Sequence, residues 1–291
     1  MSNIQRLIET QEFATLPNVA SRVLGLLEDD NADIRDISRV IETDPSLTLK
    51  LLRVANSPLY ATRTEVTSIH QAIITLGLSR LTNIVLGVSI FSKFLMSTQK
   101  GITELMEKFW WHASCTGMVA KSFSTKINKF YKENEFIGGL LHDIGKLAMM
   151  QYDFQKYLLV IDKVNKGAVD IEAEFDIFDA THLEVGSEIA KLWKLPRDLT
   201  NIITFHNEPE KSPENKDLVA IVRLSDLLCE VWGAGYYEGI KTIKFEKTES
   251  WKLLTSNFDN LKELDMEVFT LELEEDFRRS SAFLEIIASD V

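Results

Sequence analysis

GGLLHDIGKL, residues 138–147, sets a histidine beside an aspartate in an otherwise apolar stretch. We expect one helix here, with His142 and Lys146 a turn apart on the same face and Asp143 about 100° round the axis. An imidazole next to a carboxylate offers a nitrogen and an oxygen, the donors that divalent metal ions take. Two donors do not make a site. The stretch therefore predicts a metal site only if other elements bring further donors to it.

Further donors occur in order along the chain: His112 before the pair, then His182, His206 and Asp226 after it. The chain has five histidines, and His70 alone stands outside the series. Because His70 is flanked by isoleucines in its own helix, we assign it to packing. Asp226 lies in the apolar segment 219–228, where a lone carboxylate is costly unless it is paired or bound to a metal ion.

Capping residues mark where several helices begin. Asp44 is expected to cap a helix with Pro45 at its first position, where the missing N–H costs nothing. Thr181 and Glu184 have the spacing of a capping box at the start of the helix that carries His182. Strands that alternate with helices are not apparent, so the pattern predicts an all-α protein.

The ordered series resembles the HD superfamily of metal-dependent phosphohydrolases, in which a histidine, a His-Asp pair and a final aspartate bind one ion and extra histidines bind a second. His142-Asp143-Ile144-Gly145-Lys146 is similar to the family signature, and His182-Leu183-Glu184-Val185-Gly186 is similar to the His-x-x-x-Gly element of the HD-GYP branch. Where that branch has two histidines and then Gly-Tyr-Pro, this chain has His206-Asn207 and then Glu208-Pro209-Glu210-Lys211. The resemblance thus implies metal ligands, but it implies neither a three-metal site nor cyclic-dinucleotide cleavage.

The N-terminal half resembles a second, related family. Its motifs are LPNVA at 16–20, IETDPSLT at 41–48, KLLRVANSPLY at 50–60 and AIITLG at 72–77. In this order they are similar to the markers of the HDOD family, over roughly residues 9–230. HDOD proteins are bacterial regulatory modules, related to the HD hydrolases, in which the catalytic ligands are often lost. In this chain the ligand series is largely kept.

These resemblances imply an N-terminal helical unit packed with an HD-like helical bundle. We expect the N-terminal half of an HDOD domain at 1–96, an HD-like half with the candidate ligands at 102–232, and a C-terminal helical extension at 233–291. The polar stretch 97–101 is the expected boundary. Asp265 is expected to cap a last helix that packs on the second unit through its apolar face. That face is formed by Val268, Leu271, Phe277, Leu284 and Ile287.

Composition limits the partners. The formal net charge is −12 and no run of lysine or arginine is visible, so neither nucleic acid nor an anionic membrane is an expected partner. The N-terminus lacks the order of a signal peptide, and a run of about 18 apolar residues does not occur. Cys115 and Cys229 have neither zinc-finger nor CxxC spacing and are expected to be buried thiols. A cytoplasmic location is expected.

Two functions remain open. The first is a regulatory module of the HDOD type, with a signalling protein or a small phosphorylated ligand as partner. The second is a metal-dependent phosphohydrolase acting on a nucleotide or another phosphoester, with Asp143 and Lys146 as catalytic residues. Lys146 would bind the phosphate in that case, and its alternative is a solvated lysine. Both functions include a divalent metal, as one or two ions of Fe, Mn, Zn or Ni. Whether the chain is an enzyme stays open at this stage.

Overall fold

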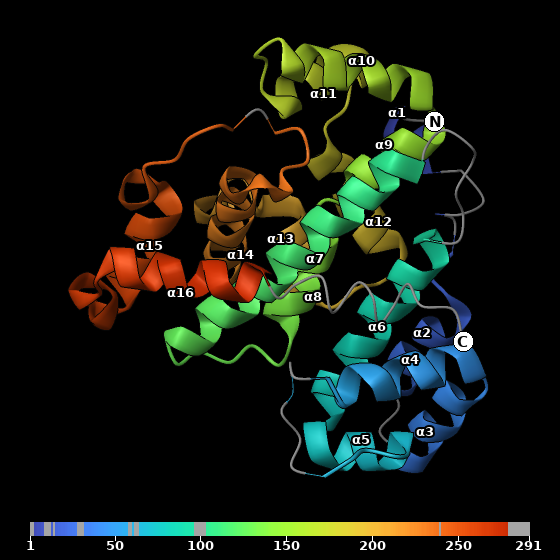
Figure 1. The fold of residues 1–291 in the computed structure, drawn as a ribbon. Helices are drawn as coiled ribbons and strands as arrows, with labels where there is room; N and C mark the ends of the chain where they lie inside the picture. The colour runs from blue at the N-terminus through green and yellow to red at the C-terminus, as the bar shows by residue number, and fades with distance from the viewer. Residues whose placement is uncertain are drawn as a thin grey trace. The chain divides into compact units, whose positions relative to one another are not determined.

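The computed structural model describes residues 3–8, 13, 15–27, 32–57, 60, 64–95, 103–238 and 240–278. Helices make up the regular structure in these ranges, where strands are absent, so the all-α prediction is confirmed. The chain forms two compact units (Figure 1). None of the helices in the described ranges combines the length and hydropathy needed to cross a lipid bilayer. The expected boundary at 97–101 lies outside the described residues.

The described residues of the smaller unit form five helices. They are α2 (Asn18–Leu27), α3 (Ile34–Glu42), α4 (Pro45–Ala55), α5 (Ile69–Leu76) and α6 (Leu78–Leu95). The apolar helix α6 packs against α2, α4 and α5, and so forms the centre of the unit. The Asp44 side chain caps α4 by accepting a hydrogen bond from the Leu47 N–H at 3.0 Å, with Pro45 at the first helical position as predicted.

The assignment of His70 to packing is wrong. Its side chain is exposed on α5, whereas its neighbours Ile69 and Ile73 are buried. Residues four apart share one face of a helix, so the two isoleucines face the core together and His70 points about 100° away from them.

The larger unit is built around the helix α7, which carries His112. Its α-helices are α1 (Asn3–Ile8), α7 (Thr103–Lys126), α8 (Asn134–Leu141), α9 (Ile144–Tyr152), α10 (Phe154–Asn165), α11 (Asp170–Phe178), α12 (His182–Leu192), α13 (Arg197–Phe205), α14 (Lys216–Cys229), α15 (Glu249–Asn257) and α16 (Met266–Arg278). Short helical turns lie at η1 (Pro209–Lys211), η2 (Glu230–Ala234), η3 (Phe245–Lys247) and η4 (Asp259–Glu263). Helix α7 packs against α8, α14 and α16, and the pair α10 and α11 forms a hairpin (Figure 1).

The last described helix packs on α7, a helix of the predicted second unit, but of the predicted face only Phe277 is buried among the described residues. Asp265 caps α16 by accepting from the Val268 N–H at 3.2 Å. The buried residues are then Phe269, Leu273 and Phe277, four apart, while Val268 is 50% exposed and Leu271 57% exposed. Phe269 makes an edge-on contact with Phe123 of α7, with ring centroids 5.0 Å apart. The predicted positions 284 and 287 lie outside the described residues.

A glycine contact brings α9 and α12 together. A Cβ atom on Gly145 would lie 2.0 Å from the His182 carbonyl oxygen and 2.9 Å from the Gly186 nitrogen. Both obstacles are backbone atoms, so they cannot turn aside as a side chain would. Gly145 therefore allows the start of α9, which follows Asp143, to reach the start of α12, which carries His182.

We predict that Gly145→Ala destabilises the larger unit by about 3 kcal/mol, because the added methyl group forces two packed helices apart. Gly25→Ala is the control, since a Cβ at this position in α2 meets nothing within 4 Å. Urea denaturation followed by circular dichroism measures both variants. Equal effects of the two substitutions would contradict a close approach at Gly145.

Candidate metal centre

His142 and Asp143 lie between two helices and not within one. Helix α8 ends at Leu141 and α9 begins at Ile144, and Asp143 has the non-helical angles φ −95° and ψ 16°. The expectation of one continuous helix through the pair is therefore wrong. The break turns the Asp143 carboxylate toward Lys146, whose Nζ lies 2.9 Å from Asp143 Oδ2. Hydrophobic periodicity does not reveal this break, because both helices are apolar around the buried pair.

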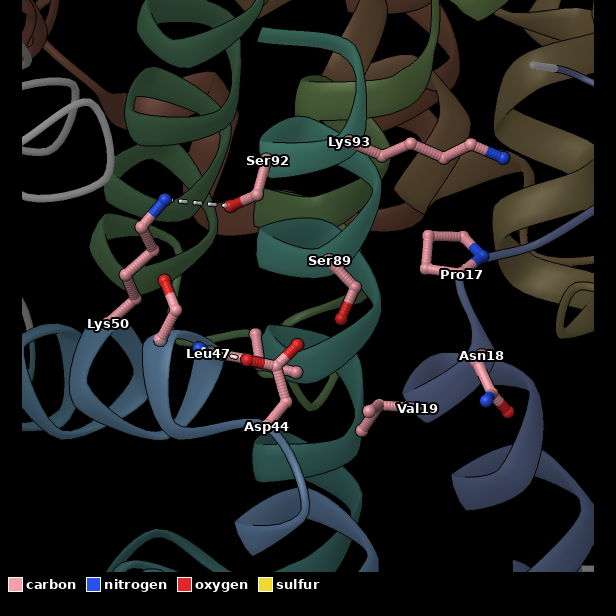
Figure 2. Close-up of a pocket in the computed structure, with 10 residues that line it drawn as sticks. Pro17, Asn18, Val19, Asp44, Leu47, Lys50, Ser89, Ser92 and Lys93 are labelled. Carbon is pink, nitrogen blue, oxygen red and sulfur yellow. Dashed lines mark hydrogen bonds between the residues drawn. The ribbon is translucent and has the colours of Figure 1, made fainter. Parts of the chain in front are cut away.

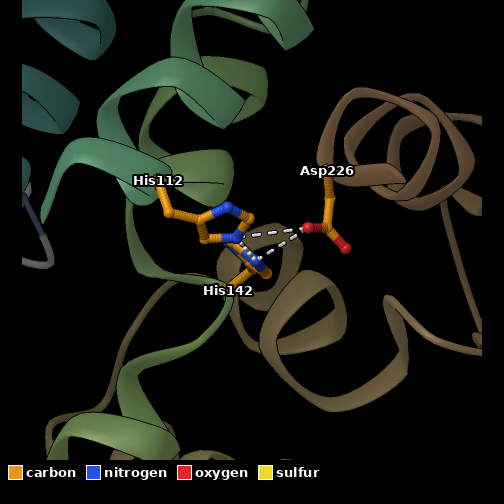
Figure 3. Close-up of side chains that lie close together, drawn as sticks. All are labelled: His112, His142 and Asp226. Carbon is orange, nitrogen blue, oxygen red and sulfur yellow. Dashed lines mark hydrogen bonds and ion pairs between the residues drawn. The ribbon is translucent and has the colours of Figure 1, made fainter. Parts of the chain in front are cut away.

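One oxygen of Asp143, Oδ2, faces the side chains of three other residues. We call these four groups the first half-site: Asp143 Oδ2, His112, His142 and Asp226. His112 Nε2 lies 3.2 Å from Asp226 Oδ1 and 3.3 Å from His142 Nε2. Asp143 Oδ2 lies 3.5 Å from His142 Nε2 and 3.8 Å from His112 Nε2. Figure 3 shows the two imidazoles and the Asp226 carboxylate pointing toward one another from three elements.

The other oxygen of Asp143, Oδ1, faces two further histidines. We call Asp143 Oδ1, His182 and His206 the second half-site. Asp143 Oδ1 lies 3.5 Å from His182 Nε2 and 3.6 Å from His206 Nε2. His182 is the first residue of α12, where Thr181 and Glu184 form the predicted capping box, and His206 follows the end of α13. The two oxygens of Asp143 thus face different half-sites, and the structure brings all six predicted metal-ligand residues together.

The four imidazoles are held by their Nδ1 atoms. His112 Nδ1 is 2.8 Å from the Ala234 carbonyl oxygen, and His142 Nδ1 is 2.7 Å from that of Gly139. His206 Nδ1 is 3.2 Å from the Ile202 carbonyl oxygen, and His182 Nδ1 is 2.7 Å from Glu174 Oε2. A carbonyl oxygen only accepts, so Nδ1 carries the proton in the neutral rings. Each Nε2 then presents a lone pair to the centre, as metal-ligating histidines do.

These donors fit a metal ion. The ligand residues His112, His142, Asp143, His182, His206 and Asp226 are all fully buried. Both oxygens of Asp143, Nε2 of His182 and of His206, and Oδ1 of Asp226 have no hydrogen-bond partner among the described residues. Buried acceptors that face one another are unfavourable unless a cation or protons lie between them. Metal–ligand bonds of about 2.1 Å place neighbouring donors of one ion about 3.0–3.4 Å apart, close to the shorter separations observed here.

Two cationic side chains connect the aspartates to a carboxylate that the sequence did not reveal. Lys146 Nζ lies 3.7 Å from Glu238 Oε1, and Arg223 binds both Asp226 at 2.6 Å and Glu238 at 2.9 Å. Burial raises the pKa of Glu238 to about 8 despite these cations. Burial also raises the pKa of Asp143, but the charges of Lys146 and the neighbouring imidazoles outweigh it and hold that pKa well below its usual value.

The hairpin of α10 and α11 adds two further carboxylates. Asp170 Oδ2 lies 2.9 Å from Lys146 Nζ, and Glu174 accepts hydrogen bonds from both the backbone and the ring of His182. Both side chains are buried, at 2% and 0% exposure. The alternative of a solvated Lys146 is therefore wrong, since this residue is 1% exposed and binds carboxylates from two elements.

Burial and charge act on the histidines in opposite directions. Burial lowers the pKa of His112, but the Asp226 carboxylate, whose Oδ1 lies 3.2 Å from His112 Nε2, outweighs it and raises this pKa to about 9. Burial also lowers the pKa of His182, and Glu174 raises it to about 9. For His206 burial prevails, and the pKa falls to about 4. The carboxylates thus draw positive charge into the centre, which either protons or a divalent cation can supply.

We predict that Arg223→Met lowers the free energy of unfolding by about 3–5 kcal/mol, because it leaves Asp226 and Glu238 buried without their shared cation. Arg197→Met is the control. The Arg197 side chain is 86% exposed beside Glu214, so its loss should change stability little. Thermal and urea denaturation measure both. A small effect at Arg223 would show that the two carboxylates do not need this cation.

Comparisons with known proteins give the family and the fold. An uncharacterized protein of Treponema pallidum (strain Nichols) is 26% identical over 226 residues, which are 73% of this chain and 42% of that protein. The chain thus spans less than half of that relative's length. An HDOD domain protein of unknown function from Geobacter sulfurreducens has a similar structure, with TM-score 0.75, 24% identity and coverage of 94% of this chain and 92% of that one.

Two further structures share the fold. A provisionally named phosphohydrolase of Shewanella amazonensis SB2B has TM-score 0.70 and 21% identity, with 97% of each chain covered. A provisionally named signal transduction protein of Marinobacter aquaeolei VT8 has TM-score 0.65 and 21% identity, with 94% of this chain and 59% of that one covered. The HDOD domain family itself matches residues 13–209, about two thirds of this chain. The chain belongs to the HDOD domain family.

Proposed function

We propose that this chain is a regulatory module whose larger unit holds a buried divalent-metal centre with a structural or sensing role. One observation carries the proposal. Six converging imidazole and carboxylate side chains are fully buried, and five of their donor atoms lack a hydrogen-bond partner among the described residues. Membership of the HDOD family and the name of the Marinobacter structure support a role in signalling.

We assign the ligands by half-site. His112, His142, Asp143 and Asp226 would hold one ion, and Asp143, His182 and His206 would hold a second. A mixed nitrogen and oxygen set of this kind suits Fe, Mn, Zn or Ni. A bound divalent ion supplies positive charge and Lewis acidity among carboxylates that outnumber the cationic side chains around them. The Nδ1 contacts orient the rings, and Lys146 and Arg223 hold the two aspartates in place.

The charge and burial of the centre favour regulation over hydrolysis. A phosphohydrolase needs a coordination position that its substrate can reach and a cation available to the phosphate. In this structure the ligand residues are fully buried, and Lys146 is held between Asp143 and Asp170. Arg223 is likewise held between Asp226 and Glu238. The cations that would bind a substrate phosphate already bind carboxylates.

We predict that protein purified without chelators or an affinity metal, and reconstituted with Mn or Fe, binds up to two equivalents of metal. Asp143→Asn should lose both ions because this carboxylate faces both half-sites, whereas His182→Ala should lose only the second. His70→Ala, on an exposed position of the smaller unit, is the control and should keep both. Elemental analysis by mass spectrometry measures the stoichiometry. A wild-type protein that binds no metal would refute the centre.

Glu174→Gln tests the second half-site without removing a ligand. It replaces the carboxylate that accepts from His182 Nδ1, so metal affinity there should fall about 10- to 100-fold while the first half-site keeps its ion. Competition with a fluorescent chelator measures the affinity. Equal loss at both half-sites would show that Glu174 acts on the fold and not on one ligand.

We predict that metal-loaded protein hydrolyses bis(p-nitrophenyl) phosphate no faster than Asp143→Asn does, because the ligand residues are buried. The absorbance of released nitrophenolate measures the rate. A metal-dependent rate that is retained in His70→Ala and lost in Asp143→Asn would instead support the phosphohydrolase alternative. Metal binding without turnover would be consistent with the regulatory proposal. Failure of the metal centre, which elemental analysis detects, can therefore be distinguished from failure of the regulatory assignment, which the hydrolysis assay detects.

A further inference from the structure

A cavity of about 320 Å³ lies within the smaller unit, and none of its lining residues belongs to the metal centre. It is bounded by the start of α2, the first two turns of α4 and the C-terminal part of α6 (Figure 2). This volume is at the lower end of the range of small-molecule sites, roughly 300–1,000 Å³. The cavity therefore suits a small molecule and not a chain segment.

Lys50 is a buried lysine that has no carboxylate partner within the described part of the chain. Its side chain is 7% exposed, and its Nζ lies 3.4 Å from Ser92 Oγ, a long hydrogen bond. The ion pairs of the described residues include none with Lys50, in contrast with Lys146 of the larger unit. A buried ammonium group with one weak acceptor is costly in the free protein. An anion in the cavity would supply the negatively charged partner for the Lys50 ammonium group.

Other donors line the same cavity. Ser89 is 6% exposed, and its hydroxyl has no hydrogen-bond partner among the described residues. Ser89 and Ser92 are three residues apart on α6 and so share a face. Lys93 adds a second positive charge, while its Nζ donates to the Thr15 carbonyl oxygen at 2.6 Å. Figure 2 shows Ser89 and Ser92 on the stretch of α6 that faces Lys50 and Asp44.

The start of α2 also adds positive potential at the cavity. The Pro17 carbonyl oxygen accepts from the Ser21 N–H at 2.9 Å, so α2 begins directly after Pro17. The ring of Pro17 has no acceptor, and the N–H groups of a first helical turn have no acceptor within the helix. These N–H groups favour an anion. Asp44 supplies the one carboxylate of the lining. One of its oxygens caps α4, which leaves the other able to accept from a hydroxyl group.

We propose that this cavity binds a small phosphomonoester that also carries a hydroxyl group. Lys50, Ser89 and Ser92 would hold the phosphate, with Lys93 and the start of α2 adding positive potential, and Asp44 would accept from the hydroxyl. Several donors that line one cavity suit the three terminal oxygens of a phosphate better than the two of a carboxylate. The site does not depend on the proposed metal centre.

The test is calorimetric titration of the full chain with inorganic phosphate and with glycerol 2-phosphate, at constant ionic strength. We expect one site per chain and tighter binding of glycerol 2-phosphate. Lys50→Met keeps the apolar stem and removes the charge, so it should weaken both probes about tenfold or more. Lys191→Met removes a lysine that is 62% exposed on α12 and should bind as the wild type does.

Ser89→Ala keeps the proposal testable if Lys50→Met does not fold. It removes a hydroxyl without a partner, so the free protein should be at least as stable, whereas phosphate binding should weaken several-fold. Wild-type protein that binds neither probe, or binding that Lys50→Met and Ser89→Ala leave unchanged, would overturn the proposal. Binding that a chelator abolishes would place the phosphate on metal ions instead. Acetate binding as tightly as phosphate would overturn the assignment to a phosphomonoester.

Discussion

The two oxygens of Asp143 face two sets of imidazoles, and the larger unit is arranged around this carboxylate. Its burial would be unfavourable in isolation, because a carboxylate loses its water there. Lys146 offsets part of that cost at 2.9 Å, but Lys146 is itself shared with Asp170. Arg223 likewise offsets part of the cost of burying Asp226, but Arg223 also binds Glu238. Negative charge therefore stays in excess, and the orphaned donor atoms lie where it is concentrated.

Several local features of the chain serve this placement. The break between α8 and α9 frees Asp143 from the helix axis, and Gly145 then lets α9 approach the backbone of His182. The capping box at Thr181 fixes the start of α12, so His182 stands at a defined point. The hairpin of α10 and α11 covers the same region with Glu174. Residues far apart in sequence thus depend on one another, and a substitution at a contact between helices would displace the donor atoms of Asp143 and His182.

The six candidate ligand residues could be named from the sequence because their order along the chain is that of a known family, and the structure brings them together. The helices could be predicted because caps such as Asp44 and Thr181 act locally. The sequence did not predict the residues around the ligands. Glu238 lies in a loop, and nothing local shows that it faces Arg223. Arg223 stands three residues before Asp226 in an apolar helix, and this spacing was a usable signal for an ion pair. The break at His142-Asp143 was missed because two short apolar helices in succession have the periodicity of one.

The two proposed sites differ in the sign of their local charge, which is negative around Asp143 and positive around Lys50. This difference explains how one acidic protein could bind both a cation and an anion. The net charge of −12 acts at long range and is screened by salt, whereas each site acts through groups within a few ångströms. Around Asp143 the carboxylates outnumber the cations, which selects a metal ion. Around Lys50 a buried ammonium and an unpaired hydroxyl outweigh the single carboxylate of Asp44, which selects an anion. In each proposed site, selectivity would follow from buried groups whose charge or hydrogen-bonding capacity is not fully satisfied, and not from the charge of the surface.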